Sequence, residues 1–319
     1  IPLGIMIRAI LISLSKSQAI KSLILRLGFT RRASRRFVAG ENQEEVIPAL
    51  KDLNARGMVT TLDILGENVL NPEDARRATG EYLRLLDRLA ASGVHSHVSV
   101  KLTQMGLDLS QELCQANLEK IVGRARETGT FVRVDMEGSP YTEATLQAYL
   151  SVRQRYGNMG IAIQSYLYRS KKDVEDLIAQ GVANVRLCKG AYLEPKSIAF
   201  PRKKDVDANY IALAEMLFAP QSLANGTYLA LATHDARIID WAKRYVALHD
   251  IPRDRFEFQM LYGIRRDLQQ QLAQEGYVMR IYVPFGDQWY PYFMRRLAER
   301  PANIFFILGN LLREPLARG

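Results

Sequence analysis

The sequence predicts an α/β fold, a distorted parallel (βα)8 barrel with an N-terminal helical extension. Eight short apolar, β-branched runs alternate with stretches of helical spacing, which is the pattern of strands joined by helices in a parallel sheet. The runs end at or close to polar or charged residues. In a parallel barrel, side chains at the carboxyl ends of the strands meet at one rim, where such barrels carry their chemistry. The sequence therefore predicts a functional site at that rim.

The predicted strands are residues 58–65, 97–101, 131–135, 161–164, 185–189, 228–234, 256–259 and 279–282. The polar residues at or near their ends are Asp63, Glu67, Lys101, Asp135, Gln164, Arg186, Lys189, Thr233, His234, Gln259 and Tyr282.

Capping residues mark the intervening helices. Asn71 and Pro72 are expected to open the first barrel helix, and Gly93 to end it. Ser110, Thr142 and Ser170 are the predicted N-caps of the next three helices, and Gly129, Gly181 and Gly276 the predicted stops. Other helices are predicted over residues 43–55, 206–218, 264–274, 288–300 and 303–312, with one more beginning at 236.

Length and composition fit one barrel with an extension. The chain has 319 residues, and a barrel core needs about 250. We expect a helical segment over 1–57 and a catalytic barrel over 58–319. The two cysteines form no CxxC pair and the histidines no HExxH motif, so no metal site is predicted. A reducing compartment, the cytoplasm, is the simplest location for a chain without a disulfide framework.

The net charge of +9 favours an anionic partner. No aromatic residues interleave with the basic runs at 31–36 and 202–204, so nucleic acid is not an expected partner, and the run at 202–204 has no assigned role. Residues 5–27 have helical apolar spacing but four charges, too many for a membrane span. Two interpretations stay open for 5–27: a peripheral contact with the inner face of the cell membrane, or a helix packed on the barrel.

Four groups of residues suggest binding chemistry. Tyr292, Arg295, Arg296 and Glu299 share one helical face. Two adjacent arginines can grip a carboxylate with paired hydrogen bonds, and Glu299 is spaced to orient either one. From these residues alone, an ordinary ion pair on a solvated helix remains the alternative.

The fifth strand ends in Arg186 and Lys189, followed by Gly190, Ala191 and Tyr192. A glycine here lets the backbone approach a flat or phosphorylated ligand closely.

Thr233 and His234 precede a predicted helix N-terminus, a combination that suits a pyrophosphate, although Asp235 could be a plain N-cap.

Lys101 and Asp135 end neighbouring strands and should meet at the barrel mouth, either as a salt bridge or as part of a site for a substrate anion.

Five segments together resemble the proline dehydrogenase family over roughly residues 36–312. They are RFVAG at 36–40, TTLDILGE at 60–67, KGAYLEP at 189–195, ATHD at 232–235 and YFMRRLAE at 292–299. The resemblance implies a distorted TIM barrel that holds FAD non-covalently, with the last barrel helix lying over the mouth.

The resemblance also implies roles by position. Lys101, Arg295 and Arg296 would hold the proline carboxylate, Tyr282 would pack beside the ring, Asp135 would steady the cations, and Arg186 would lie near flavin N5. The implied flavin-contacting residues are Gln164, Lys189, Gly190, Ala191, Tyr192, Thr233, His234 and Gln259.

The implied reaction oxidises L-proline to Δ1-pyrroline-5-carboxylate, the first step of proline catabolism to glutamate. In this reaction a hydride passes from proline C5 to flavin N5, and the reduced flavin then gives its electrons to a quinone. No strong base is evident, so proline should bind with a neutral amine and activity should rise with pH. From charge balance, Glu67 is expected to pair with Arg295 as a gate. The length leaves no room for an aldehyde dehydrogenase domain, so a separate pyrroline-5-carboxylate dehydrogenase is expected.

Two other classes are weighed against this interpretation. Another flavin barrel, similar to methylenetetrahydrofolate reductase, would need a nicotinamide or folate site. A non-catalytic basic protein that binds membrane or nucleic acid would need no polar residue at the strand ends.

Overall fold

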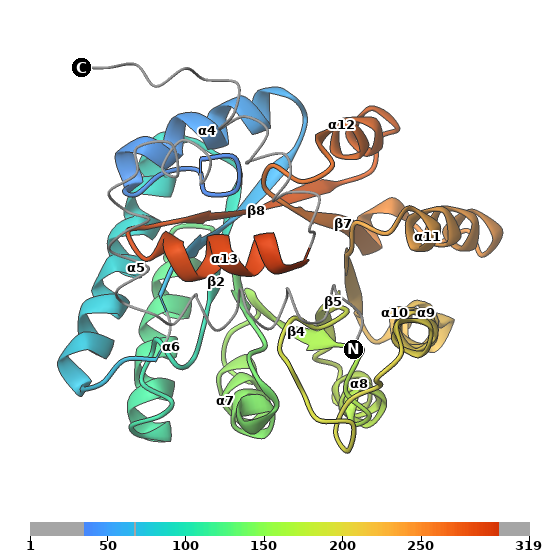
Figure 1. Cartoon of the computed structure of the whole chain (residues 1–319), viewed down its shortest axis with the longest axis horizontal. Coiled ribbons are helices and arrows are strands. Elements are labelled where there is room, and N and C mark those ends of the chain that lie inside the picture. Colours follow the sequence, from blue (N-terminus) through green and yellow to red (C-terminus); the bar gives the residue numbers. More distant parts are fainter. Residues whose placement is uncertain (1–34, 67, 300–319) are drawn as a thin grey trace.

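The computed structural model describes residues 35–66 and 68–299, with side chains through residue 294. It contains a closed barrel of eight parallel strands in chain order, with β1 hydrogen-bonded to both β2 and β8 (Figure 1). The strands are β1 Val59–Ile64, β2 Ser96–Val100, β3 Val132–Val134, β4 Met159–Gln164, β5 Asn184–Cys188, β6 Tyr228–Ala232, β7 Phe256–Leu261 and β8 Met279–Phe285. The predicted fold class is confirmed.

Helices alternate with the strands and surround them. They are α4 Gln43–Ala55, α5 Pro72–Ser92, α6 Gln111–Glu127, α7 Thr142–Arg153, α8 Ser170–Ala179, α9 Lys203–Phe218, α10 Pro220–Ala224, α11 Ala236–Leu248, α12 Arg266–Gln274 and α13 Trp289–Glu299, with short 3-10 turns η1 Ser139–Tyr141 and η2 Arg253–Arg255. Figure 1 shows α13, in red, crossing the mouth of the barrel instead of lying beside it.

Several of the predicted caps are confirmed. The Asn71 side chain accepts a hydrogen bond from the Asp74 amide at 2.9 Å, and the Ser110 hydroxyl accepts one from the Leu113 amide at 3.2 Å. Gly93 follows α5 with a φ of 69°, in the left-handed region that a residue without a Cβ adopts at least cost.

Two predicted caps are wrong. Thr142 and Ser170 are the first residues of α7 and α8, and the N-cap positions belong to Tyr141 and Arg169, which make no capping side-chain bond. The 3-10 turn η1 runs directly into α7, so the Thr142 amide is already bonded to the Ser139 carbonyl. The Ser170 hydroxyl donates instead to the Gln164 carbonyl, at the end of β4.

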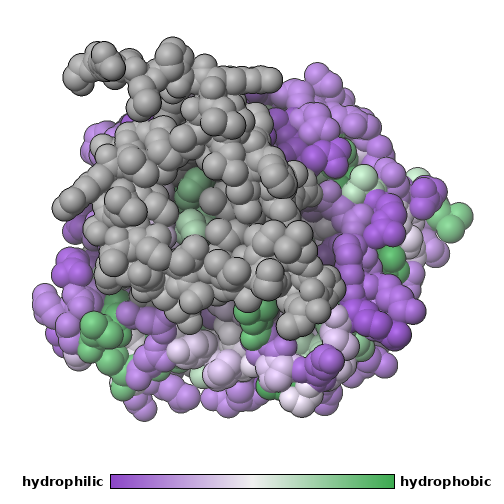
Figure 2. Space-filling view, viewed as in Figure 1, coloured by the Kyte–Doolittle hydropathy of each residue, from purple (hydrophilic) through white to green (hydrophobic). Residues whose placement is uncertain are grey.

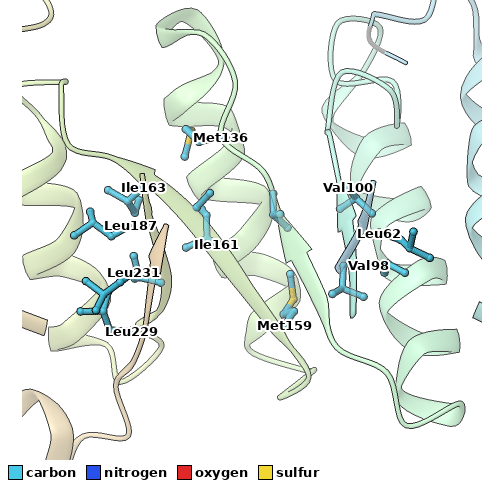
Figure 3. Packing of buried hydrophobic residues seen from close by; sticks show 14 of the residues in the cluster. Leu62, Val98, Val100, Met136, Met159, Ile161, Ile163, Leu187, Leu229 and Leu231 are labelled. Carbon is cyan, nitrogen blue, oxygen red and sulfur yellow. The ribbon is translucent and has the colours of Figure 1, made fainter. Parts of the chain in front are cut away.

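The apolar core lies between the outer faces of the strands and the helices. Leu62, Val98, Ile161, Leu187 and Leu231 belong to this cluster and are at most 1% exposed (Figure 3). Because successive strand residues point to opposite faces, the residues that alternate with members of this cluster along each strand point into the barrel. Those neighbours are largely polar: Thr61, Ser99, Arg133, Arg186, Glu257 and Arg280. Barrel interiors are more often filled by branched aliphatic side chains, so this interior is built for more than packing.

A second apolar cluster anchors α13 over the mouth. It joins Phe37 and Val38 to Leu65 and to the α13 residues Trp289, Tyr290, Tyr292, Phe293 and Met294. The segment 37–40 runs beside the end of β8, where the Ala39 amide donates to the Pro284 carbonyl at 3.0 Å and the Gly286 amide donates to the Gly40 carbonyl at 3.0 Å.

Gly263 is required by the close approach of this segment. A Cβ at Gly263 would lie 1.7 Å from the Arg36 carbonyl oxygen.

 With a φ of 75°, Gly263 lies in the left-handed region that favours glycine, and any side chain there would push the segment 36–40 away from the barrel.

The described surface seen in Figure 2 is largely hydrophilic, with apolar residues scattered over it. Within 35–66 and 68–299, no helix combines the length and apolar character that crossing a bilayer requires. The predicted helices over 5–27 and 303–312 lie outside the described residues. The division into a segment 1–57 and a barrel 58–319 stays a prediction, although α4 of the former packs Val46, Leu50 and Leu53 into the barrel's core cluster.

Candidate active site

A cavity of about 640 Å³ opens at the carboxyl ends of the strands. Its volume lies within the range of about 300–1,000 Å³ that is usual for ligand sites. Side chains from the ends of several strands line it, with Tyr192 from the β5–α9 loop and Tyr292 from α13. The predicted site residues among them are Lys101, Asp135, Gln164, Arg186, Lys189, Gly190, Ala191, Tyr192, Thr233, His234, Gln259, Tyr282 and Tyr292.

A buried cluster around Lys101 forms one side of this cavity. The Lys101 ammonium lies 2.6 Å from Asp63, 3.4 Å from Asp135 and 3.3 Å from the Tyr282 hydroxyl. The Tyr282 hydroxyl donates to Asp135 at 2.7 Å. The expected meeting of Lys101 and Asp135 is confirmed, but the shorter contact is with Asp63, because β1 adjoins β2 on the other side.

Burial and charge set the ionisation of this cluster. Burial raises the pKa of Asp63, although Lys101 opposes the shift. Burial also acts to raise the pKa of Asp135, but Lys101 and Arg186 outweigh it and the pKa falls below its usual value. Burial would lower the pKa of Lys101, but Asp63 and its other neighbours raise it well above the ordinary value. Lys101 is therefore a fixed cation, and Asp135 a fixed anion.

Arg186 lies across the floor of the cavity and is 4% exposed. Its guanidinium donates to Asp135 on the β3 side, to the Ser99 hydroxyl at 3.0 Å and to the Gln259 amide oxygen at 2.6 Å. It also lies over the Tyr282 ring, 5.2 Å from the ring centre. Contacts from four strands hold this planar cation in one orientation, with Asp135 shared between Arg186 and Lys101.

Polar groups at the ends of β4 and β6 are set by their own contacts. The Gln164 amide nitrogen donates to the Glu137 carbonyl at 2.8 Å, and the residue lines the cavity. His234 accepts a hydrogen bond from the Leu261 amide at 3.0 Å through Nε2, so its proton is on Nδ1.

Gly190 has a φ of 118°, and a Cβ there would lie 2.3 Å from the Tyr166 ring. Only glycine allows this loop to follow the cavity wall at such close range.

The N-terminus of α11 lies beside an ion-pair cluster at the rim. Lys189 contacts Asp207 at 2.6 Å and Asp235 at 2.9 Å, and Lys203 and Arg237 contact the same two carboxylates. Asp235 is also the N-cap of α11, as the alternative interpretation had it. Three cations around two carboxylates leave this part of the rim positive. Lys203, from the basic run without an assigned role, lines the cavity.

The remaining predicted residues lie beyond what the structure describes. Glu67 is outside the described residues, as are the side chains of Arg295, Arg296 and Glu299, although α13 carries these three. Sequence reasoning did not assign a role to Asp63, the partner closest to Lys101. Its position at the end of a strand, like that of Lys101 and Asp135, was the signal that could have found it.

His95 and His97 lie at the N-terminal end of β2 and do not line the cavity. Among the described residues, no group of three or more His, Cys, Asp or Glu side chains is arranged to hold a metal ion.

Comparison with known proteins identifies related sequences. The sequence model of the proline dehydrogenase family matches residues 46–307. The chain is 40% identical over 309 residues to proline dehydrogenase 1 of Bacillus subtilis (strain 168), covering 97% of this chain and 100% of that protein. It is 42% identical over 286 residues to proline dehydrogenase of Deinococcus radiodurans, covering 87% and 89%.

A solved structure has the same fold. It is proline utilization A from Bdellovibrio bacteriovorus, inactivated by N-propargylglycine, with a TM-score of 0.80 and 27% identity. The match covers 90% of this chain and 35% of the other, so this chain spans about a third of that longer protein. Of the two flavin-barrel interpretations, these matches support the one based on the proline dehydrogenase resemblance.

Proposed function

The chain belongs to the proline dehydrogenase family, a flavin-dependent family that oxidises proline, and from this we propose that it converts L-proline to Δ1-pyrroline-5-carboxylate with FAD. The observation that carries the proposal is the pair of buried cations Lys101 and Arg186, linked through Asp135 and lining a single cavity. Lys101 suits the substrate carboxylate, and Arg186 suits an electron-accepting ring.

The described residues fit a flavin dinucleotide. The floor offers the Arg186 guanidinium, and Gln164 and Gln259 supply amides of the kind that pair with the polar edge of a flavin ring. The positive rim at the N-terminus of α11, near Thr233 and His234, suits a diphosphate. Gly190 and Ala191 would cover the ring with backbone and a small side chain, and Tyr192 would add an aromatic ring beside them.

On this proposal Lys101 binds the proline carboxylate, and Tyr282, held by Asp135 and Lys101, packs beside the pyrrolidine ring. Arg295 and Arg296 would add two further cations, oriented by Glu299, and Glu67 would pair with Arg295 to close the site. The position of α13 over the mouth supports this arrangement, since Tyr292 from the same helix lines the cavity.

When bound, FAD supplies the acceptor for the hydride that leaves proline C5. The protein's residues hold the substrate in place for that transfer. In the described part of the cavity, Asp135 is committed to Lys101, Arg186 and Tyr282, and Asp63 to Lys101, so neither is placed as a mobile base. We therefore propose that proline binds with its amine neutral, having lost the proton to solvent, and that activity rises with pH.

For the remaining steps we propose a membrane quinone as electron acceptor and a separate dehydrogenase that consumes the pyrroline product. The positive net charge supports a peripheral contact of the protein with an anionic cytoplasmic membrane face. The cytoplasm is the proposed location.

Isotope labelling tests which bond is oxidised. L-Proline carrying two deuterium atoms at C5 should give a product that retains one of them, because one leaves as the hydride. Proline labelled at C2 should keep its deuterium. Mass spectrometry of the product reads both results, and loss of the C2 label with retention of both C5 labels would contradict the proposed reaction.

A further inference from the structure

A buried ion pair lies inside the barrel, one layer below the cavity. Arg280 of β8 donates to both carboxylate oxygens of Glu257 of β7, at 2.8 Å and 3.0 Å. Glu257 is 1% exposed and Arg280 7% exposed, and neither lines the cavity. The pair therefore cannot touch a ligand bound there, and its effect on the site must pass through a neighbour.

Glu257 is ionised in the folded protein. Burial alone would raise the pKa of its carboxyl group, but the charge and hydrogen bonds of Arg280 lower that pKa to about 2. The Tyr228 hydroxyl adds a further hydrogen bond at 3.1 Å. An ionised carboxylate can only accept hydrogen bonds, so every polar group that faces it must present a donor.

This requirement decides the orientation of the Gln259 side chain. Its amide nitrogen donates to Glu257, which turns the amide oxygen toward Arg186, 2.6 Å from Nε. The reversed amide would set its oxygen against the carboxylate and its N–H groups against the guanidinium. Both contacts would then be repulsive, in a region where buried unpaired groups are costly.

Arg186 depends on Gln259 for one of its three acceptors. The other two are Asp135 and Ser99, and together the three lie on different strands and fix the plane of the guanidinium. Without the correctly turned Gln259 amide, the Nε–H of a nearly fully buried arginine loses its acceptor, and the side chain must shift to find another.

We propose that Glu257 is a positioning residue for the reaction: by orienting the Gln259 amide, it fixes the Arg186 guanidinium at the floor of the flavin site. The inference rests on the proposed function, because it assigns to Arg186 a place beside the flavin. Glu257, paired with Arg280 below the site, would act on the reaction without contacting a ligand.

The test compares three holoenzymes: the wild type, the Glu257→Met variant, which has no acceptor for the Gln259 amide, and the Tyr228→Phe variant. The second variant is a matched control, since it removes a hydrogen bond from the same carboxylate but does not contact Gln259. Two readouts are needed: the midpoint potential of the bound flavin without proline, and the kcat and KM for proline.

In Glu257→Met we expect kcat to fall about tenfold, the lower end of the loss found when an outer-shell hydrogen-bond partner is removed from a metal site, with KM changed less than about twofold. The flavin potential should become more negative, because Arg186 moves from the ring. Simple loss of a buried negative charge would move the potential in the opposite direction. A positive shift or an unchanged kcat would overturn the proposal, and Tyr228→Phe should match the wild type in both.

Breaking a buried ion pair can prevent folding. The double variant Glu257→Met, Arg280→Met removes both charges, and such replacements are often neutral for stability. It still removes the acceptor for Gln259, so the same fall in kcat is expected, and a wild-type kcat in a folded double variant would overturn the proposal. The potential is measured without proline, so it tests the role of Glu257 independently of the reaction. If proline fails to reduce the wild-type flavin, the proposed function is refuted, and the potentials still test the role of Glu257.

Discussion

Lys101 carries much of the charge balance of the cavity. It lies between Asp63 and Asp135, and their combined charge holds its pKa well above the ordinary value. A substrate carboxylate that replaces one of its two longer contacts, at 3.3 Å and 3.4 Å, would gain a charge-assisted hydrogen bond in a largely desolvated place. Such a bond is worth about 1.5–3 kcal/mol.

Replacing Lys101 by Met should therefore raise the KM for proline by about 10- to 100-fold. The fold should survive, because Asp63, whose pKa burial already raises, can take up a proton when the ammonium is lost. Steady-state kinetics and thermal unfolding check these two expectations. Lys120→Met, on the exposed surface of α6, is the matched control. A KM within twofold of the wild-type value would contradict the proposed role of Lys101.

The sequence predicts the rim residues better than the layer below them. Lys101, Asp135 and Gln259 end apolar runs, so their positions at the mouth follow from the strand pattern. Glu257 and Arg280 lie inside such runs, where a charge has no evident role in one sequence. The two-residue alternation places Glu257 on the same face as Gln259, but the pairing of Glu257 with Arg280 depends on the register of β7 against β8, which only the closed barrel fixes.

Among the elements, α13 differs most from a plain barrel helix. It crosses the mouth and is held there by the segment 37–40 and the apolar cluster around Phe293, whose ring lies 6.2 Å from that of Phe37. Because this cluster is separate from the main core, its loss should loosen α13 before it unfolds the barrel.

Phe293→Ala should raise the KM for proline about tenfold or more, because α13 would no longer hold its side chains over the site, while the melting temperature changes little. Phe218→Ala in the main core is the matched control, since both phenylalanines are 2–3% exposed. It should lower the free energy of unfolding by about 3–5 kcal/mol and leave KM unchanged. Equal effects of the two substitutions on KM would refute the anchoring role of the α13 cluster.

Helix starts could be predicted where the capping hydrogen bond lies within the helix itself. The predictions were wrong where the residue bonds to another part of the chain. Asn71 and Ser110 bond to their own helices, and the sequence identifies them. Ser170 bonds to the Gln164 carbonyl of the preceding strand end, a contact that depends on how the loop folds back. The 3-10 turn before α7 likewise lies outside the reach of a capping rule.

At the scale of the whole molecule, the charged interior of the barrel affects stability. His97 points toward this interior, and its ring lies 4.9 Å from that of Phe131. Burial lowers its pKa well below the ordinary 6.5, with Arg280, Arg133 and Arg186 acting in the same direction and Glu257 opposing them. His97 is thus neutral in the folded protein, but it takes up a proton in the unfolded chain below about pH 6.5.

Stability should therefore fall as the pH drops below about 6.5, since the unfolded state then binds the extra proton. For this one group the loss between pH 7 and pH 5.5 is about 1 kcal/mol. Denaturant titrations of the wild type and His97→Gln should show a shallower decline in the variant. His249→Gln, which changes an exposed histidine after α11, should behave as the wild type. Identical slopes for the wild type and His97→Gln would contradict a depressed pKa at His97.

The closed barrel itself could be predicted because eight β–α units leave few other arrangements. The position of α13 could not be derived from strand and helix patterns, since it depends on distant contacts with the segment 37–40. It was expected only from the family resemblance.

Proline oxidation at this site is tested most directly by an anaerobic visible spectrum of the FAD-loaded protein before and after L-proline is added. We expect a flavin absorption band that bleaches with L-proline and stays unchanged with D-proline or buffer. A bound flavin that L-proline leaves oxidised, in protein with the spectrum and stability of a folded holoenzyme, would contradict proline oxidation at this site.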